Sequence, residues 1–177
     1  MNILLKILAG LGVIIALLLI IALFIKKEYT VEREITINKA KADVFNYIKY
    51  LKNQDHYSKW VMRDPAMKKE FSGTDGTEGF VYAWDSKNKN AGKGEQEIKK
   101  INENNRVDVE VRFKKPFKST AETYMTTKEE LQNQTKVKWS MNGNSKYPLN
   151  LTNLFMDNML GKDMEASLTN LKSILEK

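Results

Sequence analysis

Few side chains in this 177-residue sequence could do acid–base or nucleophilic chemistry, since it contains one histidine and no cysteine. The lack of cysteine excludes a thiol nucleophile and a thiolate ligand for zinc. One histidine does not make the imidazole cluster that many metal sites use. His56 lies in the polar stretch NQDHYSKW, which is typical of a surface position rather than of a catalytic base. We therefore expect no metal site and no cofactor.

Three carboxylates, Asp85, Glu95 and Glu97, could in principle act as a general acid or base. Lysines are their neighbours in the sequence, and this pattern favours solvated salt bridges over a catalytic pair. The glycines of GTDGTEG lie between two predicted strands with no helix behind them, which argues against a phosphate-binding loop. The sequence thus predicts no catalytic residue.

The stretch GFVYAWDS carries three aromatic residues at alternate positions, Phe80, Tyr82 and Trp84. Side chains two apart on a strand share one face of the sheet, so the three rings form a row. Such a row must meet apolar material. Either the protein fills that space with its own side chains, or it leaves room for a guest molecule.

These residues belong to an ordered series of predicted elements. EYTVEREITIN alternates as a strand does, KAKADVFNYIKYLKN repeats apolar residues at helical spacing, and DHYSKWVM is a second short helix that Asp64-Pro65 ends. Six strands follow, at 67–73, 79–86, 92–104, 106–113, 119–131 and 135–143. The last element is a long helix over 150–176, which we expect to be interrupted near Gly161.

Two of these strands show how the sheet is oriented. RVDVEVRF and TKVKWSMNG each place apolar residues on one face and charged or polar residues on the other. This alternation is typical of an antiparallel sheet with one face in water and the other on the core. The C-terminal helix repeats apolar residues at three- and four-residue steps and supplies the partner for the apolar face.

Residues 3–25 are almost wholly apolar, with Lys6 as the one charged residue. A helix that spans a bilayer needs about 20 such residues, so this segment predicts a transmembrane anchor. The alternative is a cleaved secretory signal, but Phe24, Ile25 and Lys26 make a poor cleavage junction. We divide the chain into an anchor at 1–27 and one domain at 28–177, in a single-pass membrane protein.

Charge bears on both sidedness and partners. Lysines and arginines follow the apolar segment, and the positive-inside rule therefore favours a domain that faces the cytoplasm. Over the whole chain, 29 Lys and Arg outnumber 22 Asp and Glu. The two signs are mixed along the sequence, which indicates a solvated surface rather than a groove for nucleic acid. No nucleic-acid partner is predicted.

The element order and several motifs resemble the SRPBCC superfamily, which contains the START-related and polyketide cyclase-like helix-grip proteins. The motifs are VEREITI, VFNYIKYLKN, YSKW, DPAM, FSGTDGTEGFVYAW, GKGEQEI, TKVKW and LTNLKSILE. The bacterial polyketide cyclase-like branch is the most similar, and some of its members carry an N-terminal membrane helix. The resemblance implies an α+β fold in which a seven-stranded antiparallel sheet wraps a long C-terminal helix. It also implies a deep cavity that binds hydrophobic ligands in many relatives.

The resemblance turns the aromatic row into a candidate cavity wall. Trp60, in the YSKW segment beside the cavity mouth of relatives, is a candidate gate. The other predicted wall residues are Phe80, Tyr82, Trp84, Trp139, Met141, Phe155, Met156 and Met159. Inward aromatic and methionine side chains can equally be packed core, and the sequence leaves this alternative open. Methionine is flexible and polarizable, which suits a wall that adapts to different guests.

Arg33 does not fit a purely apolar wall, because it shares the parity of Val31 and Ile35. A buried charge needs a partner, and Glu95 or Glu97 could supply one. Alternatively, Arg33 lies at the sheet rim and extends to water. A third hypothesis makes Arg33 the anchor for the polar head of an acidic lipid or carboxylate ligand.

Three functions follow from these observations. The first is a membrane-anchored module that binds a hydrophobic small molecule or lipid, such as a quinone or a polyketide-like compound. The second is a polyketide cyclase-like enzyme, against which the lack of an acid, base or nucleophile set counts. The third is a protein-interaction module of the chaperone-regulator type. We favour the first.

Overall fold

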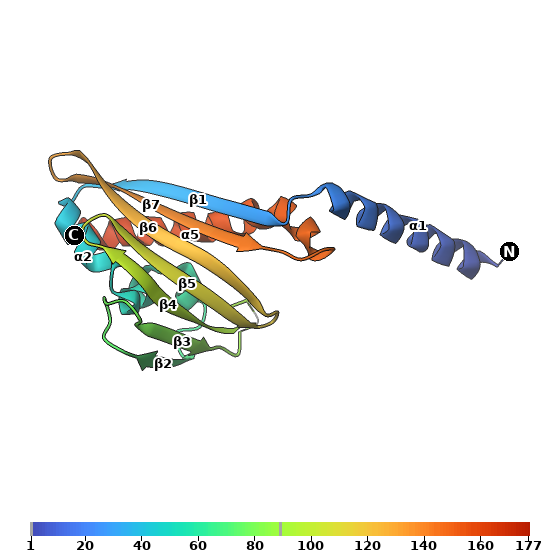
Figure 1. Cartoon of the computed structure of the whole chain (residues 1–177), viewed down its shortest axis with the longest axis horizontal. Coiled ribbons are helices and arrows are strands. Elements are labelled where there is room, and N and C mark those ends of the chain that lie inside the picture. The colour runs from blue at the N-terminus through green and yellow to red at the C-terminus, as the bar shows by residue number, and fades with distance from the viewer. Residues whose placement is uncertain (1, 89) are drawn as a thin grey trace.

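The computed structural model describes residues 2–88 and 90–177 and contains one sheet, one long helix on it and a projecting N-terminal helix (Figure 1). The helices are α1 (Ile3–Phe24), α2 (Lys41–Ile48), α3 (Gln54–Tyr57), α4 (Lys59–Met62) and α5 (Asn153–Leu175), with short 3-10 helices η1 (Leu51–Asn53) and η2 (Leu149–Thr152). The strands are β1 (Glu28–Ile37), β2 (Lys68–Ser72), β3 (Val81–Asp85), β4 (Lys93–Asn102), β5 (Arg106–Lys115), β6 (Ser119–Leu131) and β7 (Gln134–Asn144).

The seven strands form one antiparallel sheet in the order β1-β7-β6-β5-β4-β3-β2. This confirms the predicted seven-stranded sheet with a long C-terminal helix. The first and last strands are neighbours, and α5 lies along the inner face nearest them (Figure 1). The other strands curve away from α5 (Figure 1), and on this side α2 contacts β6 and β7 while α3 and α4 contact α5.

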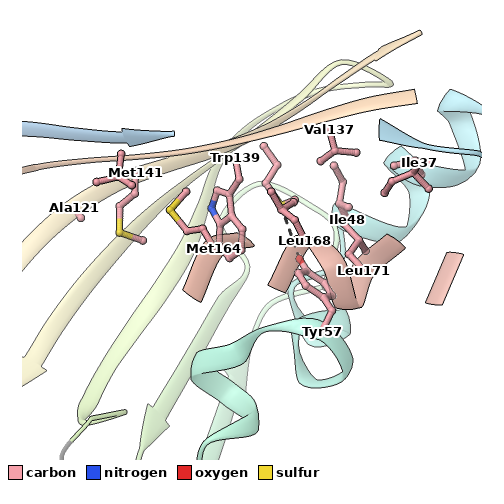
Figure 2. Close-up of a cluster of buried hydrophobic side chains, with 13 residues drawn as sticks. Ile37, Ile48, Tyr57, Ala121, Val137, Trp139, Met141, Met164, Leu168 and Leu171 are labelled. Carbon is pink, nitrogen blue, oxygen red and sulfur yellow. Dashed lines mark hydrogen bonds between the residues drawn. The ribbon is translucent and has the colours of Figure 1, made fainter. Parts of the chain in front are cut away.

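Alternation along each strand separates a core face from a charged face, as the sequence predicts. Val107, Val109 and Val111 of β5 are buried on the inner face. On the outer face of the same strand, Arg112 pairs with Glu95 and Glu97 of β4. Figure 2 shows the larger inner cluster, in which Trp139 and other β7 side chains meet those of α5.

The prediction that the C-terminal helix is interrupted near Gly161 is wrong, because α5 runs unbroken from Asn153 to Leu175. Instead, Gly161 leaves room for the side chain of Arg33 to pack against the helix. A Cβ atom at this position would clash with Nη2 of Arg33, which crosses the helix there. The predicted helix at 55–62 is also divided, since Ser58 is extended between α3 and α4.

Strand pairing brings several chain segments to one end of the sheet. Glu28 pairs with Asn144, Phe113 with Ser119, and Lys93 with Lys115. The start of β1 is therefore at the same end as the β5–β6 and β3–β4 loops. We call it the anchor end, because α1 leaves the domain there (Figure 1).

The helix α1 is long and apolar enough to cross a membrane, by length and composition. A signal sequence near the N-terminus meets the same criterion. Its side chains are almost all exposed, and Ala22 is the one buried residue of the helix.

Candidate functional site: a cavity between the sheet and the helices

A cavity of about 260 Å³ lies between the inner face of the sheet and the helices. Its closed part is lined by buried residues of α2, η1, β4 and β5, including Ile48, Leu51, Val107 and Val109. The exposed lining residues Asn90, Lys115 and Pro116 all lie at the anchor end. Leu160 of α5 lines the cavity from the helix side. The cavity therefore opens at the anchor end, between the β5–β6 loop and α5, and we call this opening the mouth.

Two aromatic pairs form much of the wall. Trp60 of α4 lies edge-on to Trp139 of β7, with ring centroids 5.6 Å apart and an interplanar angle of 90°. Trp84 of β3 lies edge-on to Phe113 of β5 at 6.1 Å and 82°. Edge-to-face contacts are a preferred geometry of aromatic pairs, and they hold these four rings in position.

Gly94 of β4 determines where the Trp84 ring lies. A Cβ atom at Gly94 would approach the indole to 2.7 Å and the carbonyl oxygen of Arg112 to 2.6 Å. The missing side chain lets the indole lie across the neighbouring strand, where Trp84 Nε1 donates a 2.9 Å hydrogen bond to the carbonyl of Ala91. The glycine of GKGEQEI thus shapes the cavity wall.

An amide pair supplies polar groups to the apolar cavity. Gln96 Nε2 of β4 donates to Gln54 Oε1 of α3 at 2.9 Å, and both residues line the cavity. This bond uses one donor and one acceptor, so the pair retains capacity for a carbonyl or hydroxyl of a guest. Neither glutamine was a predicted site residue. The sequence alternation could have identified Gln96, because it shares the inner face of β4 with Gly94 and Ile98.

Tyr82 is the cavity residue with the strongest electrostatic perturbation. Its hydroxyl donates a 2.7 Å hydrogen bond to Asp55 Oδ1, and Lys69 pairs with the same carboxylate. Burial raises the pKa of the phenol, and the bond to Asp55 raises this pKa further. A phenol held neutral cannot accept a proton, and its own proton is directed at Asp55. The arrangement orients the ring and does not favour acid–base catalysis.

The predicted wall residues divide into three groups. Five line the cavity: Trp60, Tyr82, Trp84, Trp139 and Met141. Phe80 is 1% exposed and packs in the core with Phe45 and Leu51, while Met156 packs against the larger cluster. Phe155 and Met159 face away from the sheet and are 61% and 62% exposed, which corrects their placement on the wall. The helix turns its Leu160, Met164 and Leu168 side inward instead, so apolar character alone was a poor guide.

Arg33 faces α5 as its parity predicts, but its predicted partners are wrong. Arg33 Nε donates to Glu165 at 2.7 Å, and Nη1 donates to Asp157 at 2.8 Å. Both carboxylates belong to α5, whereas Glu95 pairs with Arg112 on the outer face. The two ion pairs occupy the guanidinium, and this weakens its role as an anchor for a ligand head group.

Gly161 and Arg33 are expected to be energetically coupled. Gly161→Ala should lower the free energy of unfolding by about 1 kcal/mol, because displacing the guanidinium from its carboxylates outweighs the roughly 1 kcal/mol that alanine gains in a helix. In an Arg33→Ala background the clash is gone, so the same change should be stabilising. Urea unfolding of the full chain in detergent measures both. The same sign in both backgrounds would contradict the coupling.

The carboxylates considered above as a possible general acid or base lie outside the cavity and form ion pairs. Asp85 pairs with Lys93, and Glu97 with Lys99 and Arg112, as predicted from their lysine neighbours. His56 is exposed on α3. Within residues 2–88 and 90–177, no group of three or more His, Cys, Asp or Glu side chains could hold a metal ion.

Comparison with known proteins shows the family and the fold. A family model described as polyketide cyclase/dehydrase and lipid transport matches residues 28–176. No curated protein matches the sequence at a level that counts as a relative. Among solved structures, truncated norcoclaurine synthase from Thalictrum flavum aligns with a TM-score of 0.63 at 9% identity, covering 83% of this chain and 92% of that one.

Two further solved structures give the same result. Ara h 8.0201 aligns with a TM-score of 0.58 at 17% identity, over 84% of this chain and 97% of that chain. XoxI from Bacillus cereus aligns with a TM-score of 0.61 at 14% identity, over 83% of this chain and 95% of that chain. Identities this low show a shared fold and nothing more.

Proposed function

We propose that this domain is a binding module for a hydrophobic small molecule. The proposal starts from the family, since the chain belongs to the polyketide cyclase/dehydrase and lipid transport family over residues 28–176. The single observation that carries the proposal is the cavity of about 260 Å³, lined mainly by apolar side chains. This volume is just below the range of about 300–1,000 Å³ typical of ligand pockets. It suits a small apolar guest or part of a lipid, quinone or polyketide-like molecule.

The chemistry of the wall supports binding over catalysis. The amide pair of Gln54 and Gln96 provides one polar contact that would orient a carbonyl or hydroxyl, while Tyr82 is neutral and engaged with Asp55. In a relative of the same fold, norcoclaurine synthase was crystallised in complex with dopamine and hydroxybenzaldehyde. That complex supports the use of this fold to enclose small aromatic molecules.

The helix α1 supports anchoring of the module to a membrane. The division that we propose is an anchor at 1–27 and a binding domain at 28–177, with the domain on the cytoplasmic side because Lys26 and Lys27 follow the span. A tether keeps the module at a high effective concentration of any guest that partitions into the bilayer.

The experiment that tests binding fills the cavity. Val109→Trp places a large ring in the cavity from the middle of β5, whereas Glu122→Trp adds the same ring to the exposed outer face. Full-length protein is purified gently from its host and weighed by native mass spectrometry, and any released compound is identified after organic extraction. A hydrophobic fluorescent probe, cis-parinaric acid, reports binding independently.

We expect a stoichiometric apolar molecule in the wild type and in Glu122→Trp. Val109→Trp should lose it and bind the probe at least about tenfold more weakly, since the ring occupies the guest's volume. Its free energy of unfolding should change little, because the ring enters unoccupied space. Equal probe affinity in the three proteins would overturn the proposal.

A further inference from the structure

Side chains of the C-terminal region hold the end of α1. Asn150 Nδ2 donates to the carbonyls of Ala22 at 2.6 Å and Ile25 at 2.8 Å. The hydroxyl of Tyr147 lies 3.4 Å from the carbonyl of Leu19. The last carbonyls of a helix have no partner within it, and lipid offers none. Asn153 Nδ2 donates to the carbonyls of Lys26 and Lys27 at 2.9 Å, so two asparagine side chains hold the domain to the end of α1.

This connection sets the depth of the anchor end in a bilayer. The 22 residues of α1 extend about 33 Å as a helix, and the hydrocarbon core is about 30 Å thick. If α1 spans the core, the carbonyls of Leu19 and Ala22 lie close to its edge. Residues of η2, which contact this part of α1, and the adjoining start of α5, which contacts Lys26 and Lys27, must then lie at the level of the lipid head groups.

Large apolar side chains are exposed at the anchor end. We call them the rim: Phe117 in the β5–β6 loop, 76% exposed, and Leu149, Leu154, Phe155 and Met159 on η2 and α5, each 61% or 62% exposed. The rim adjoins the mouth along the chain, since Phe117 follows the lining residue Pro116 and Met159 precedes the lining residue Leu160. In Figure 1 the β5–β6 loop and the start of α5 both lie on the side of the domain from which α1 projects.

Positive charge accompanies the rim. The exposed lysines at the anchor end include Lys26, Lys27, Lys115, Lys118 and Lys146. Exposed aromatic and aliphatic side chains among lysines are typical of surfaces that enter the interface of an anionic membrane. Continuity with α1 favours lipid as the occupant, because any other partner would have to displace the bilayer at the end of the anchor.

We propose that the rim inserts into the interfacial layer of the membrane that α1 spans, so that the mouth opens directly against lipid. A guest then passes between the bilayer and the cavity without crossing water. This inference rests on the proposed membrane anchor, and it adds a second lipid contact, a fixed orientation and a route of entry.

Single spin labels test the insertion, because the chain has no cysteine and each introduced cysteine is unique. Full-length Phe117→Cys and Phe155→Cys are labelled in vesicles of phosphatidylcholine and phosphatidylglycerol. The matched control is Leu131→Cys, which is 66% exposed at the β6–β7 turn at the opposite end of the sheet. A fourth label at Leu17 reports on α1 itself. Accessibility to oxygen and to a water-soluble nickel complex gives the depth of each label.

We expect labels 117 and 155 to be more accessible to oxygen than to nickel, and label 131 to show the reverse. If labels 117 and 155 behave like label 131 while label 17 reports lipid, the rim proposal is overturned and the anchor stands. An aqueous label 17 overturns the anchor. Spin–spin broadening of label 155 that grows with the protein-to-lipid ratio would assign the rim to a second copy of the chain and also overturn the proposal.

Two variants separate orientation from contact. Asn150→Ala combined with Asn153→Ala should shift label 155 toward water while label 17 stays in lipid, because the carbonyls of Ala22, Ile25, Lys26 and Lys27 lose these side-chain donors. Phe155→Glu with Met159→Glu should slow uptake of cis-parinaric acid from vesicles at least about tenfold. Its affinity for the same probe in detergent should match the wild type. Unchanged uptake would contradict entry through the rim.

Discussion

Trp139→Ala is expected to lower the free energy of unfolding by about 3–5 kcal/mol, the usual cost of removing a large aromatic ring from a core. The indole is 4% exposed and lies between β7 and α5, beside Met164 (Figure 2). Its Nε1 donates a 2.8 Å hydrogen bond to Thr123 Oγ1, which in turn donates to the carbonyl of Ser140. Removal would enlarge a cavity that already exists and leave Trp60 without its edge-on partner.

Trp139→Phe is the matched variant that keeps an aromatic ring and removes the N–H donor. It should cost about 1–2 kcal/mol, because Thr123 loses one partner and the smaller ring leaves a little space. Urea unfolding of the full chain in detergent, followed by far-ultraviolet circular dichroism, gives both values. A cost below about 1 kcal/mol for Trp139→Ala would show that the indole belongs to the ligand site more than to the core.

The sequence allowed most of the architecture to be predicted, because period-two alternation is a local signal. In RVDVEVRF each valine on the inner face is followed by a charged residue on the outer face, and the strand forms where expected. Turn residues fixed the boundaries in the same way: the GTDGTEG stretch separates β2 from β3. The number of strands and the position of the C-terminal helix follow from these short-range patterns.

Contacts between distant elements could not be read from such patterns. The predicted pairing of Arg33 with Glu95 or Glu97 assumed that β1 and β4 lie close together, but three strands separate them in the sheet. The true partners, Asp157 and Glu165, come from the helix that crosses β1. Parity gave the face on which Arg33 lies, and tertiary arrangement alone gave its partners.

The candidate site was predictable on the strands and poorly predictable on α5. On β3 and β7, parity gave the inner face for Tyr82, Trp84 and Trp139, which line the cavity, but it did not distinguish them from Phe80, which is packed in the core. On α5, the apolar residues near the N-terminus cover more than one side of the helix, so composition did not distinguish Leu160, which lines the cavity, from Met159, which is exposed. The exposed apolar side of α5 is the side for which we propose a contact with the membrane.

Gly94→Val is expected to cost about 3 kcal/mol of unfolding free energy and to abolish binding of the guest. The first added atom would approach the Arg112 carbonyl to 2.6 Å and the Trp84 indole to 2.7 Å. Rotating the indole relieves only one of these clashes, because the other is with the backbone of β5. Displacement of Trp84 would also break its hydrogen bond to the carbonyl of Ala91 near the mouth.

A double-mutant cycle separates the two clashes. In a Trp84→Leu background the ring is absent, so Gly94→Val should retain only the backbone part of its cost, and the two changes should be non-additive by at least about 1 kcal/mol. Unfolding of the four proteins by urea gives the coupling, and cis-parinaric acid binding gives the effect on the cavity. Additive costs would mean that Gly94 serves the β4–β5 pairing alone. The position of the Trp84 ring would then depend on its contact with Phe113 and not on Gly94.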